Sequence, residues 1–287
     1  MTLSLSARLP EEVTMNFNLL ALELQFSLKQ RISVIFILFA LAYGYLINAQ
    51  DIGEGMALIA LNSPYRISYF LTLTSALLLI VVSLLAVSAL LKDTDYGFCH
   101  IIDTISYKEV MLSRSMIIIA TCLMISMCLI VGMIVALVLG QSGIETAINP
   151  QRLLDFNLSH FLWPWLIIVV PNVLFLSAII IWTTLKWQSA KVTYLACMLL
   201  FALFWLALVI VNAPITGPTM LNDSLWTDIF AIVDPFASSA FFEQTQIWTA
   251  EEKNSQQPTL TGNLLVNRLL VCLMVLTIFV HLIRSNL

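Results

Sequence analysis

The residue types that most often carry catalysis do not form a recognisable catalytic pattern in this chain. The three histidines, His100, His160 and His281, lie far apart in the sequence. A zinc peptidase needs two histidines one helical turn apart with a glutamate between them, because both must reach one metal ion. That spacing is absent. The five cysteines also lack metal or redox spacing, so we expect them to be small hydrophobic residues.

A nucleotide-binding loop is missing as well. Such a loop cradles phosphates with the backbone amides of a glycine-rich turn that ends in Lys-Ser or Lys-Thr. None of the nine glycines precedes such a pair. We therefore predict that the chain is not an enzyme and holds no cofactor or metal of its own.

The densest group of charges in the first two thirds of the chain is the segment 92–114. Within it, Phe98, Ile101, Ile102 and Ile105 recur at the spacing of one apolar stripe on a helix. A short amphipathic helix of this kind can lie in the lipid headgroup layer, or insert its apolar face into a groove of a soluble partner. A simple loop is the third alternative. The polar surface around the stripe comes from Lys92, Asp93, Asp95, Asp103, Lys108, Glu109 and Arg114.

The composition places the chain in a membrane. Of its 287 residues, 60% are hydrophobic and 10% are charged, whereas soluble domains carry about 25% charged residues. Several apolar runs are long enough to cross a bilayer as helices. The net charge of −4 and the absence of a basic tract give no indication of nucleic-acid binding.

We predict an all-α, polytopic fold with six spans in a single domain, residues 16–287. Residues 1–15 are expected to be a disordered tail. The segment Asn16–Arg31 is expected to be an amphipathic helix in the membrane interface. The segment 212–262, rich in acidic residues, is expected to be an extracytoplasmic loop. The expected spans are 32–47, 67–91, 115–140, 161–185, 192–211 and 264–283.

Ionisable groups at mid-membrane, which ion-coupled carriers need, are absent from the predicted spans except for Arg268 near one end. The remaining polar atoms are hydroxyls and amides, such as Asn172 and Ser177. They are expected either to bond neighbouring helices or, with Pro171, to line a substrate path. Because proline removes a backbone donor, Pro164 and Pro171 predict a kink in the fourth span.

The distribution of lysine and arginine predicts the orientation. With a cytoplasmic N-terminus, nine basic residues fall on the cytoplasmic side and four on the other, counting residues 8–284. Both termini and the segment 92–114 are therefore expected to be cytoplasmic.

Several stretches, in this order, resemble permeases of the type-2 ABC exporter superfamily (ABC-2 type), and most closely those fused in many bacteria to a zinc aminopeptidase-like domain. They are L-E-L-Q-F-S-L-K-Q-R (22–31), N-S-P-Y (62–65), A-L-L-K-D-T-D-Y-G (89–97), D-P-F (234–236) and W-T-A-E-E-K-N with L-T-G-N-L-L-V-N-R-L-L (248–270). The chain departs from the fused pattern because it ends after six spans, without the second membrane half or the peptidase-like domain.

This resemblance implies a partner arrangement. Two six-span permeases, identical or homologous, would sit on cytoplasmic ATPase subunits that bind ATP and magnesium, in a bacterial inner membrane. The N-terminal helix would be an elbow helix, and 92–114 would be the coupling helix that docks into the ATPase. By position, the docking residues would be Asp93, Asp95, Gly97, Phe98, Ile101, Ile102 and Ile105.

Two function classes follow. The first is a permease subunit that couples ATP hydrolysis by the partner to substrate export. The second is a membrane scaffold or assembly factor that binds a cytoplasmic partner through the same segment without transport.

Overall fold

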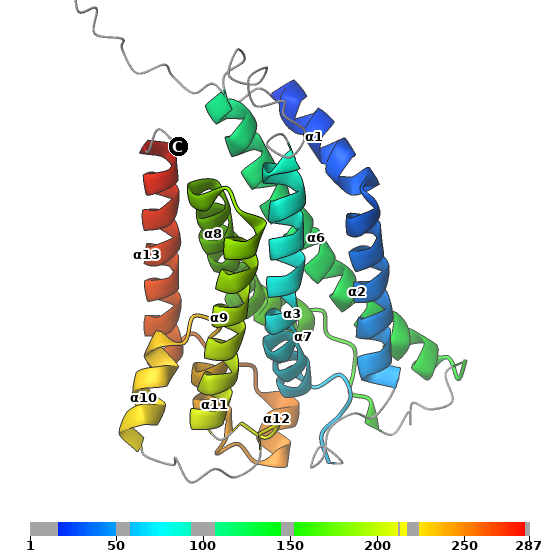
Figure 1. Ribbon diagram of the computed structural model, residues 1–287. Helices are drawn as coiled ribbons and strands as arrows, with labels where there is room; N and C mark the ends of the chain where they lie inside the picture. Colours follow the sequence, from blue (N-terminus) through cyan, green and yellow to red (C-terminus); the bar gives the residue numbers. More distant parts are fainter. Residues whose placement is uncertain are drawn as a thin grey trace, which may run out of the picture.

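The computed structural model describes residues 17–49, 58–92, 107–144, 152–211, 213–216 and 224–284. The secondary structure in these ranges is helical (Figure 1). The long helices are α1 (Phe17–Lys29), α2 (Arg31–Ala49), α3 (Pro64–Leu90), α6 (Tyr107–Gln141), α8 (Val170–Trp187), α9 (Ala190–Ile210) and α13 (Gly262–Arg284). The short ones are α7 (Ser159–Pro164), α10 (Ser224–Val233), α11 (Ser238–Thr245) and α12 (Ala250–Ser255).

Among the described residues, six helical stretches are long and apolar enough to cross a membrane, which confirms the expected all-α, multi-pass class. All six lie within a few residues of the predicted spans, except that the third is longer at its start. They are Arg31–Ala49, Pro64–Leu90, Val110–Gln141, Ser159–Trp187, Ala190–Ile210 and Gly262–Arg284.

Two helices begin at least three residues before the spans that hydropathy predicted. The hydroxyl of Ser63 accepts the backbone N–H of Arg66 at 3.1 Å, and Pro64 occupies the first turn, so α3 begins at Pro64. Arg66, which directly precedes the predicted span 67–91, therefore lies inside the helix and is fully buried. Helix α6 begins at Tyr107, so Arg114 belongs to this helix and not to the loop before it.

The predicted N-terminal helix is present as α1. It ends at Lys29 and is followed almost directly by α2, with a bend between the two (Figure 1). The hydroxyls of Ser27 and Thr121 lie 3.1 Å apart, which fixes α1 against α6. Whether α1 also lies in a headgroup layer stays a prediction.

Helices α2 and α6 pack backbone against backbone at two glycines. A Cβ atom on Gly44 would lie 2.1 Å from the carbonyl oxygen of Leu129, and one on Gly132 would lie 2.2 Å from that of Leu41. Two membrane helices can approach this closely where a glycine or another small residue lies at the contact. The close approach matters because helices in lipid are held together by dispersion contacts and not by hydrophobic burial. The Asn48 amide also donates to the carbonyl of Met133 at 3.1 Å.

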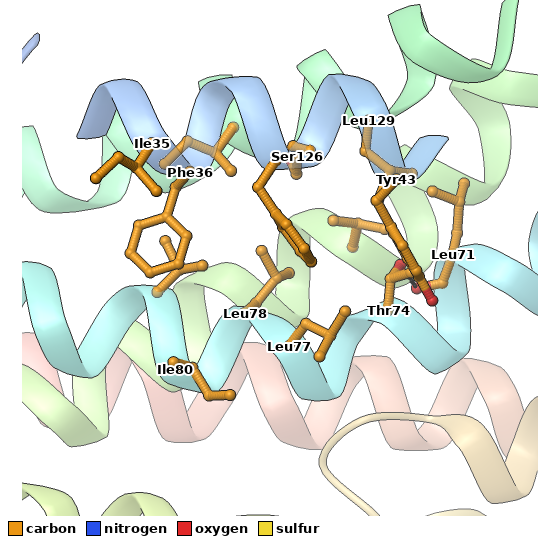
Figure 2. A pocket seen from close by; sticks show the side chains of 15 residues that line it. Ile35, Phe36, Tyr43, Leu71, Thr74, Leu77, Leu78, Ile80, Ser126 and Leu129 are labelled. Carbon is orange, nitrogen blue, oxygen red and sulfur yellow. Dashed lines mark hydrogen bonds between the residues drawn. The ribbon is translucent and has the colours of Figure 1, made fainter. Parts of the chain in front are cut away.

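On its other side, α2 packs less closely against α3, and an apolar cavity of about 250 Å³ lies between α2, α3 and α6 (Figure 2). Its walls are almost entirely aliphatic and aromatic side chains. The predicted path residues Pro171, Asn172 and Ser177 do not line it.

The predicted distortion of the fourth span is a π-turn at Trp165–Val169, between α7 and α8. The backbone N–H of Val170 donates to the carbonyl of Trp165, five residues back. Pro164 and Pro171 flank the turn and lack the N–H groups of a regular helix. The indole N–H of Trp165 donates to the hydroxyl of Ser126 at 2.9 Å, which holds the turn against α6.

The bundle has two distinct ends. The start of α1, the turn between α8 and α9 and the end of α13 lie at one end, which we call the α1 end (Figure 1). Helices α10, α11 and α12 lie at the opposite end, which we call the α11 end. In the predicted loop 212–262, α11 is buried against α3, α9 and α13, so this part of the segment is not a solvated linker.

Candidate functional site

The residues predicted to dock onto a partner lie outside the described residues. They are Asp93, Asp95, Gly97, Phe98, Ile101, Ile102 and Ile105. The structure describes instead the two helix ends that flank them, namely the end of α3 and the first turns of α6.

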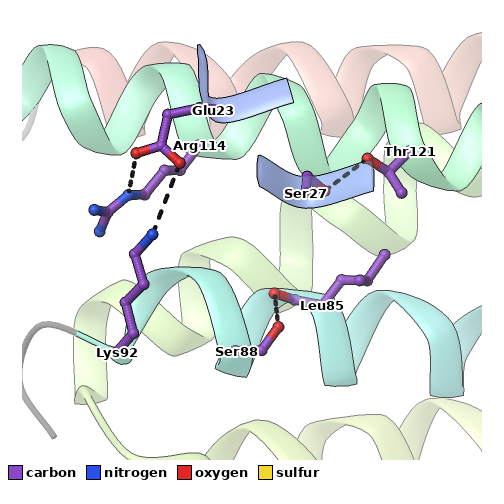
Figure 3. A network of polar contacts seen from close by, with 7 residues as sticks. All are labelled: Glu23, Ser27, Leu85, Ser88, Lys92, Arg114 and Thr121. Carbon is purple, nitrogen blue, oxygen red and sulfur yellow. Dashed lines mark hydrogen bonds and ion pairs between the residues drawn. The ribbon is translucent and has the colours of Figure 1, made fainter. Parts of the chain in front are cut away.

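These flanks are joined to α1 by one carboxylate. A Glu23 oxygen accepts the Nε–H of Arg114 at 3.2 Å, and the other Glu23 oxygen lies 3.7 Å from the Lys92 ammonium (Figure 3). Glu23 lies on α1, Lys92 lies two residues after the end of α3, and Arg114 lies on α6. The three side chains are only 22% exposed or less, so solvent screens the pairs less than at an open surface.

Lys92 makes a second contact with α1. Its ammonium lies 4.7 Å from the centre of the Phe26 ring, a cation–π geometry. The carboxylate of Glu23 and the ring of Phe26 thus both hold the last residue described before the segment 93–106. We call Glu23, Phe26, Lys92 and Arg114 the flank cluster.

The predicted path residue Asn172 lies in a second, buried polar cluster. Its amide NH₂ donates to the hydroxyl of Ser75 at 3.0 Å and to the carbonyl of Phe236 at 2.9 Å, and its oxygen accepts from Arg268 at 2.9 Å. Asn172 is fully buried, and so is Ser177, whose hydroxyl has no hydrogen-bond partner among the described residues. Pro171 is partly exposed.

Arg268, on α13, connects this amide to the turn between α10 and α11. Its guanidinium donates to the Asn172 oxygen, to the Pro235 carbonyl at 3.2 Å, and twice to the Asn267 side-chain oxygen at 2.6 and 3.0 Å. The Asn267 amide donates in turn to the carbonyls of Ala231, Ile232 and Asp234.

The turn itself is built around Asp234. Its carboxylate accepts from the backbone N–H groups of Phe236 at 3.0 Å and Ser239 at 2.9 Å, and from the hydroxyl of Ser238 at 2.5 Å. Ala237 adopts a left-handed conformation, with φ of 56°, which the carboxylate contacts on both sides stabilise. Asp234 is 1% exposed. The negative charge of Asp234 lies near the start of α11, where it interacts favourably with the positive end of the helix dipole.

This second cluster ties α3, α8 and α13 to the α10–α11 turn, and we call it the α11-end lock. It consists of Ser75, Asn172, Asp234, Asn267 and Arg268. No side chain in this cluster is a nucleophile positioned by a base. The cluster acts as a clamp, because its hydrogen bonds to backbone carbonyls hold the α10–α11 turn in place. Of these residues, only Asn172 was singled out as a site residue from the sequence. The other residues could have been suspected from the adjacent polar pair Asn267 and Arg268, which interrupts an apolar run of the sequence.

The loops at the α11 end are also bonded to one another. The Asn254 side chain accepts the N–H of Ala60 at 2.8 Å and donates to the carbonyl of Leu58 at 3.1 Å. At the start of α12, Thr249 and Glu252 form a capping box. The backbone N–H and the hydroxyl of Thr249 donate to the Glu252 carboxylate and lower its pKa, whereas burial lowers the pKa of Lys253.

Comparisons with protein-family models, curated proteins and solved structures gave no match. Within the described ranges, no three His, Cys, Asp or Glu side chains gather closely enough to hold a metal ion.

Proposed function

We propose that this protein is the membrane-spanning permease subunit of an ABC transporter of the ABC-2 type. In this proposal a separate cytoplasmic ATPase binds and hydrolyses ATP, and a second permease, identical or homologous, completes the transporter. The order of elements supports it: a helix before the first span, two spans, a charged segment, and four further spans. The sequence stretches that resemble this superfamily extend over most of the chain.

The observation that carries the proposal is the flank cluster. The segment 93–106, with its predicted docking stripe, connects α3 to α6, and Glu23 holds the ends of both helices to α1. A displacement of this segment by an ATPase would therefore move α1, α3 and α6 together. Helix α3 contacts α8 and α9, and α6 contacts α2 and α8. Rigid-body movement of these packed helices is an established way of switching between two states.

We propose that the protein lies in a bacterial inner membrane with the α1 end in the cytoplasm, and the basic residues at the two ends support this orientation. Among the described residues, the basic ones nearer the α1 end lie at the junction of α1 and α2, after α3, in the first turns of α6, beside the turn between α8 and α9, and at the end of α13. They are Lys29, Arg31, Lys92, Arg114, Lys186, Lys191 and Arg284. Those nearer the α11 end are Arg66, Arg152, Lys253 and Arg268. An excess of basic residues marks the cytoplasmic side.

At the other end, the α11-end lock would act as the extracytoplasmic gate. Its hydrogen bonds hold the α10–α11 turn against α8 and α13, so an outward-open state would have to break some of them. Asn172 would then be free to face the substrate. In this open state, Asn172, Pro171 and Ser177 would line the substrate path.

The test is purification of the protein in mild detergent, with identification of the proteins that remain bound. We expect an ATPase at about one copy per permease. Recovery without an ATPase in all nucleotide states would contradict the proposal and support the scaffold function.

A double substitution makes this test specific to the docking stripe. Ile101→Asp with Ile102→Asp should abolish ATPase binding while leaving membrane insertion intact. The matched control is Leu58→Asp with Ile247→Asp, two side chains that are 79% and 82% exposed at the α11 end. Equal ATPase recovery with both double variants would show that the stripe is not the docking surface.

A further inference from the structure

The cavity between α2, α3 and α6 opens toward the outer surface of the bundle at mid-span depth. Its rim includes Ile35, Phe39 and Ile80, which are 63%, 52% and 47% exposed. Phe39 is the ninth residue of the 19-residue helix α2, about 12 Å from its start at the helical rise of 1.5 Å per residue. Because α2 and α3 both have the length and composition of spans, this opening faces the hydrocarbon part of a bilayer.

The lining offers a guest almost no polar contact. The Thr74 hydroxyl donates to the Leu71 carbonyl at 3.0 Å. The Ser126 hydroxyl donates to the Leu123 carbonyl at 2.7 Å and accepts from Trp165. Figure 2 shows Tyr43 with its hydroxyl at the end of the cavity near Leu71 and Thr74. The rest of the wall is C–H surface, and none of the described residues that line it is charged.

The volume also restricts the occupant. At about 250 Å³ the cavity is smaller than the roughly 300–1,000 Å³ of pockets for drug-sized ligands. An apolar cavity gives water too few hydrogen-bond partners, so water is a poor occupant. The molecules that meet an opening at this depth are lipid tails.

We propose that this cavity is a binding site for one acyl chain of a membrane phospholipid. The chain enters between Phe39 and Ile80 and lies along Phe36, Leu77 and Leu78. The hydrophobic effect does not favour the cavity over bulk lipid for an acyl chain, because the two environments are equally apolar. The preference comes from dispersion contacts with a concave wall, which a flat helix face lacks. The site stands independently of the proposed transport function.

The test is photo-cross-linking in a reconstituted bilayer. The probe is phosphatidylcholine with a diazirine in the middle of one acyl chain, added to unlabelled phospholipid, and the cross-linked residues are mapped by mass spectrometry. The reference is the outward face of α9, where Leu195, Met198 and Leu199 are at least 57% exposed. We expect labelling of the cavity residues on α2 and α3 to exceed that of α9 by about threefold or more.

Two cavity-filling variants give the decisive comparison. Leu77→Trp and Thr74→Phe should each reduce cavity labelling to the α9 level, and either suffices if the other does not fold. Leu195→Trp, the same enlargement on the outward face of α9, should leave cavity labelling unchanged. Equal labelling of the cavity and of α9 in the unmodified protein would contradict the proposal, because it would show that lipid contacts the cavity no more than any other outward face. Labelling unaffected by both fillings would also overturn the proposal.

Discussion

Arg268 shows how a charged residue is accommodated inside a helix of membrane-spanning composition. Its guanidinium is 5% exposed and donates to the side-chain oxygens of Asn172 and Asn267 and to the carbonyl of Pro235. Both asparagine oxygens accept from Arg268. The arginine therefore satisfies buried acceptors on two spans and one turn at the same time.

Replacing Arg268 should consequently destabilise the protein more than its charge alone suggests. In Arg268→Leu, two buried amide oxygens lose their donor, at about 1–3 kcal/mol for each. Arg268→Lys should be intermediate, because an ammonium cannot reproduce the planar fork of the guanidinium. The measurement is the thermal unfolding midpoint in detergent. Arg284→Leu, at the exposed end of the same helix, is the control. A midpoint for Arg268→Leu equal to that of the control would refute the clamp role.

At the α11 end, Glu252 gives a prediction on pH. Its folded-state pKa is lowered by the two donors of Thr249, so the carboxylate stabilises the α12 cap above the ordinary glutamate pKa. That stabilisation is lost as the pH falls through the lower, folded value. Thr249→Val removes the hydroxyl donor and should raise the pKa of Glu252, as measured by carboxyl-carbon NMR on selectively labelled glutamate. A pKa that does not move would assign the shift to the backbone donor alone.

At this scale the sequence was informative only where a polar residue interrupts an apolar run. Asn172 stands out in this way beside Pro171, and it does lie in the buried lock. Arg268 was noticed but placed near a span end, since a linear pattern cannot show that Asn172 and Pro235 come within reach. Ser75 and Asp234 gave weaker signals, because their roles depend on contacts between segments distant in the sequence.

Among the elements, the α2–α6 pair has the closest packing, through Gly44 and Gly132. Gly44→Leu and Gly132→Leu should each force the two backbones apart and destabilise the fold by about 1–3 kcal/mol or more. Thermal unfolding in detergent is again the measurement. Val131→Leu, next to Gly132 but 47% exposed, should change little. Stability retained in both glycine variants would mean that α2 and α6 cross differently.

The flank cluster predicts how firmly α1 is held. A disulfide between cysteines at positions 27 and 121, whose native hydroxyls are 3.1 Å apart, reports the contact between α1 and α6. In a Glu23→Gln background it should form roughly 1.4-fold to fivefold more slowly, which corresponds to about 0.2–1 kcal/mol for an exposed ion pair. Glu251→Gln on α12 should have no effect. An unchanged rate in Glu23→Gln would show that the ion pairs do not position α1.

Hydropathy predicted where the spans are, because composition alone determines which helices can enter a bilayer. It predicted their ends less well. Ser63 and Pro64 start α3 ahead of its apolar run, a capping effect that hydropathy does not register. In 212–262, the polar residues suggested a loop, although the Thr249 and Glu252 spacing is a helix-start signal and F-A-S-S-A-F-F (236–242) is apolar enough to be buried.

For the whole molecule, the predicted orientation can be tested with cysteines at its two ends. In a background with the native cysteines replaced, Ser255→Cys at the α11 end should react with an impermeant thiol reagent on intact cells. Gln188→Cys, in the exposed turn between α8 and α9 at the α1 end, should react only after lysis. The reverse pattern would invert the topology and place the segment 93–106 outside the compartment that contains ATP.

The π-turn at Trp165–Val169 preserves the phase of the helix that follows it. One residue occupies about 100° of a regular α-helix, and a π-turn holds one residue more than an α-turn. The turn therefore takes up a surplus residue without changing the direction in which Asn172 points. Deleting one codon from 165–169 should make this turn a regular α-turn and leave the orientation of α8 unchanged. Asn172 should then still accept the hydrogen bond from Arg268. Among relatives of this chain, residues of α8 aligned across a one-residue gap at this turn would remain equivalent in space.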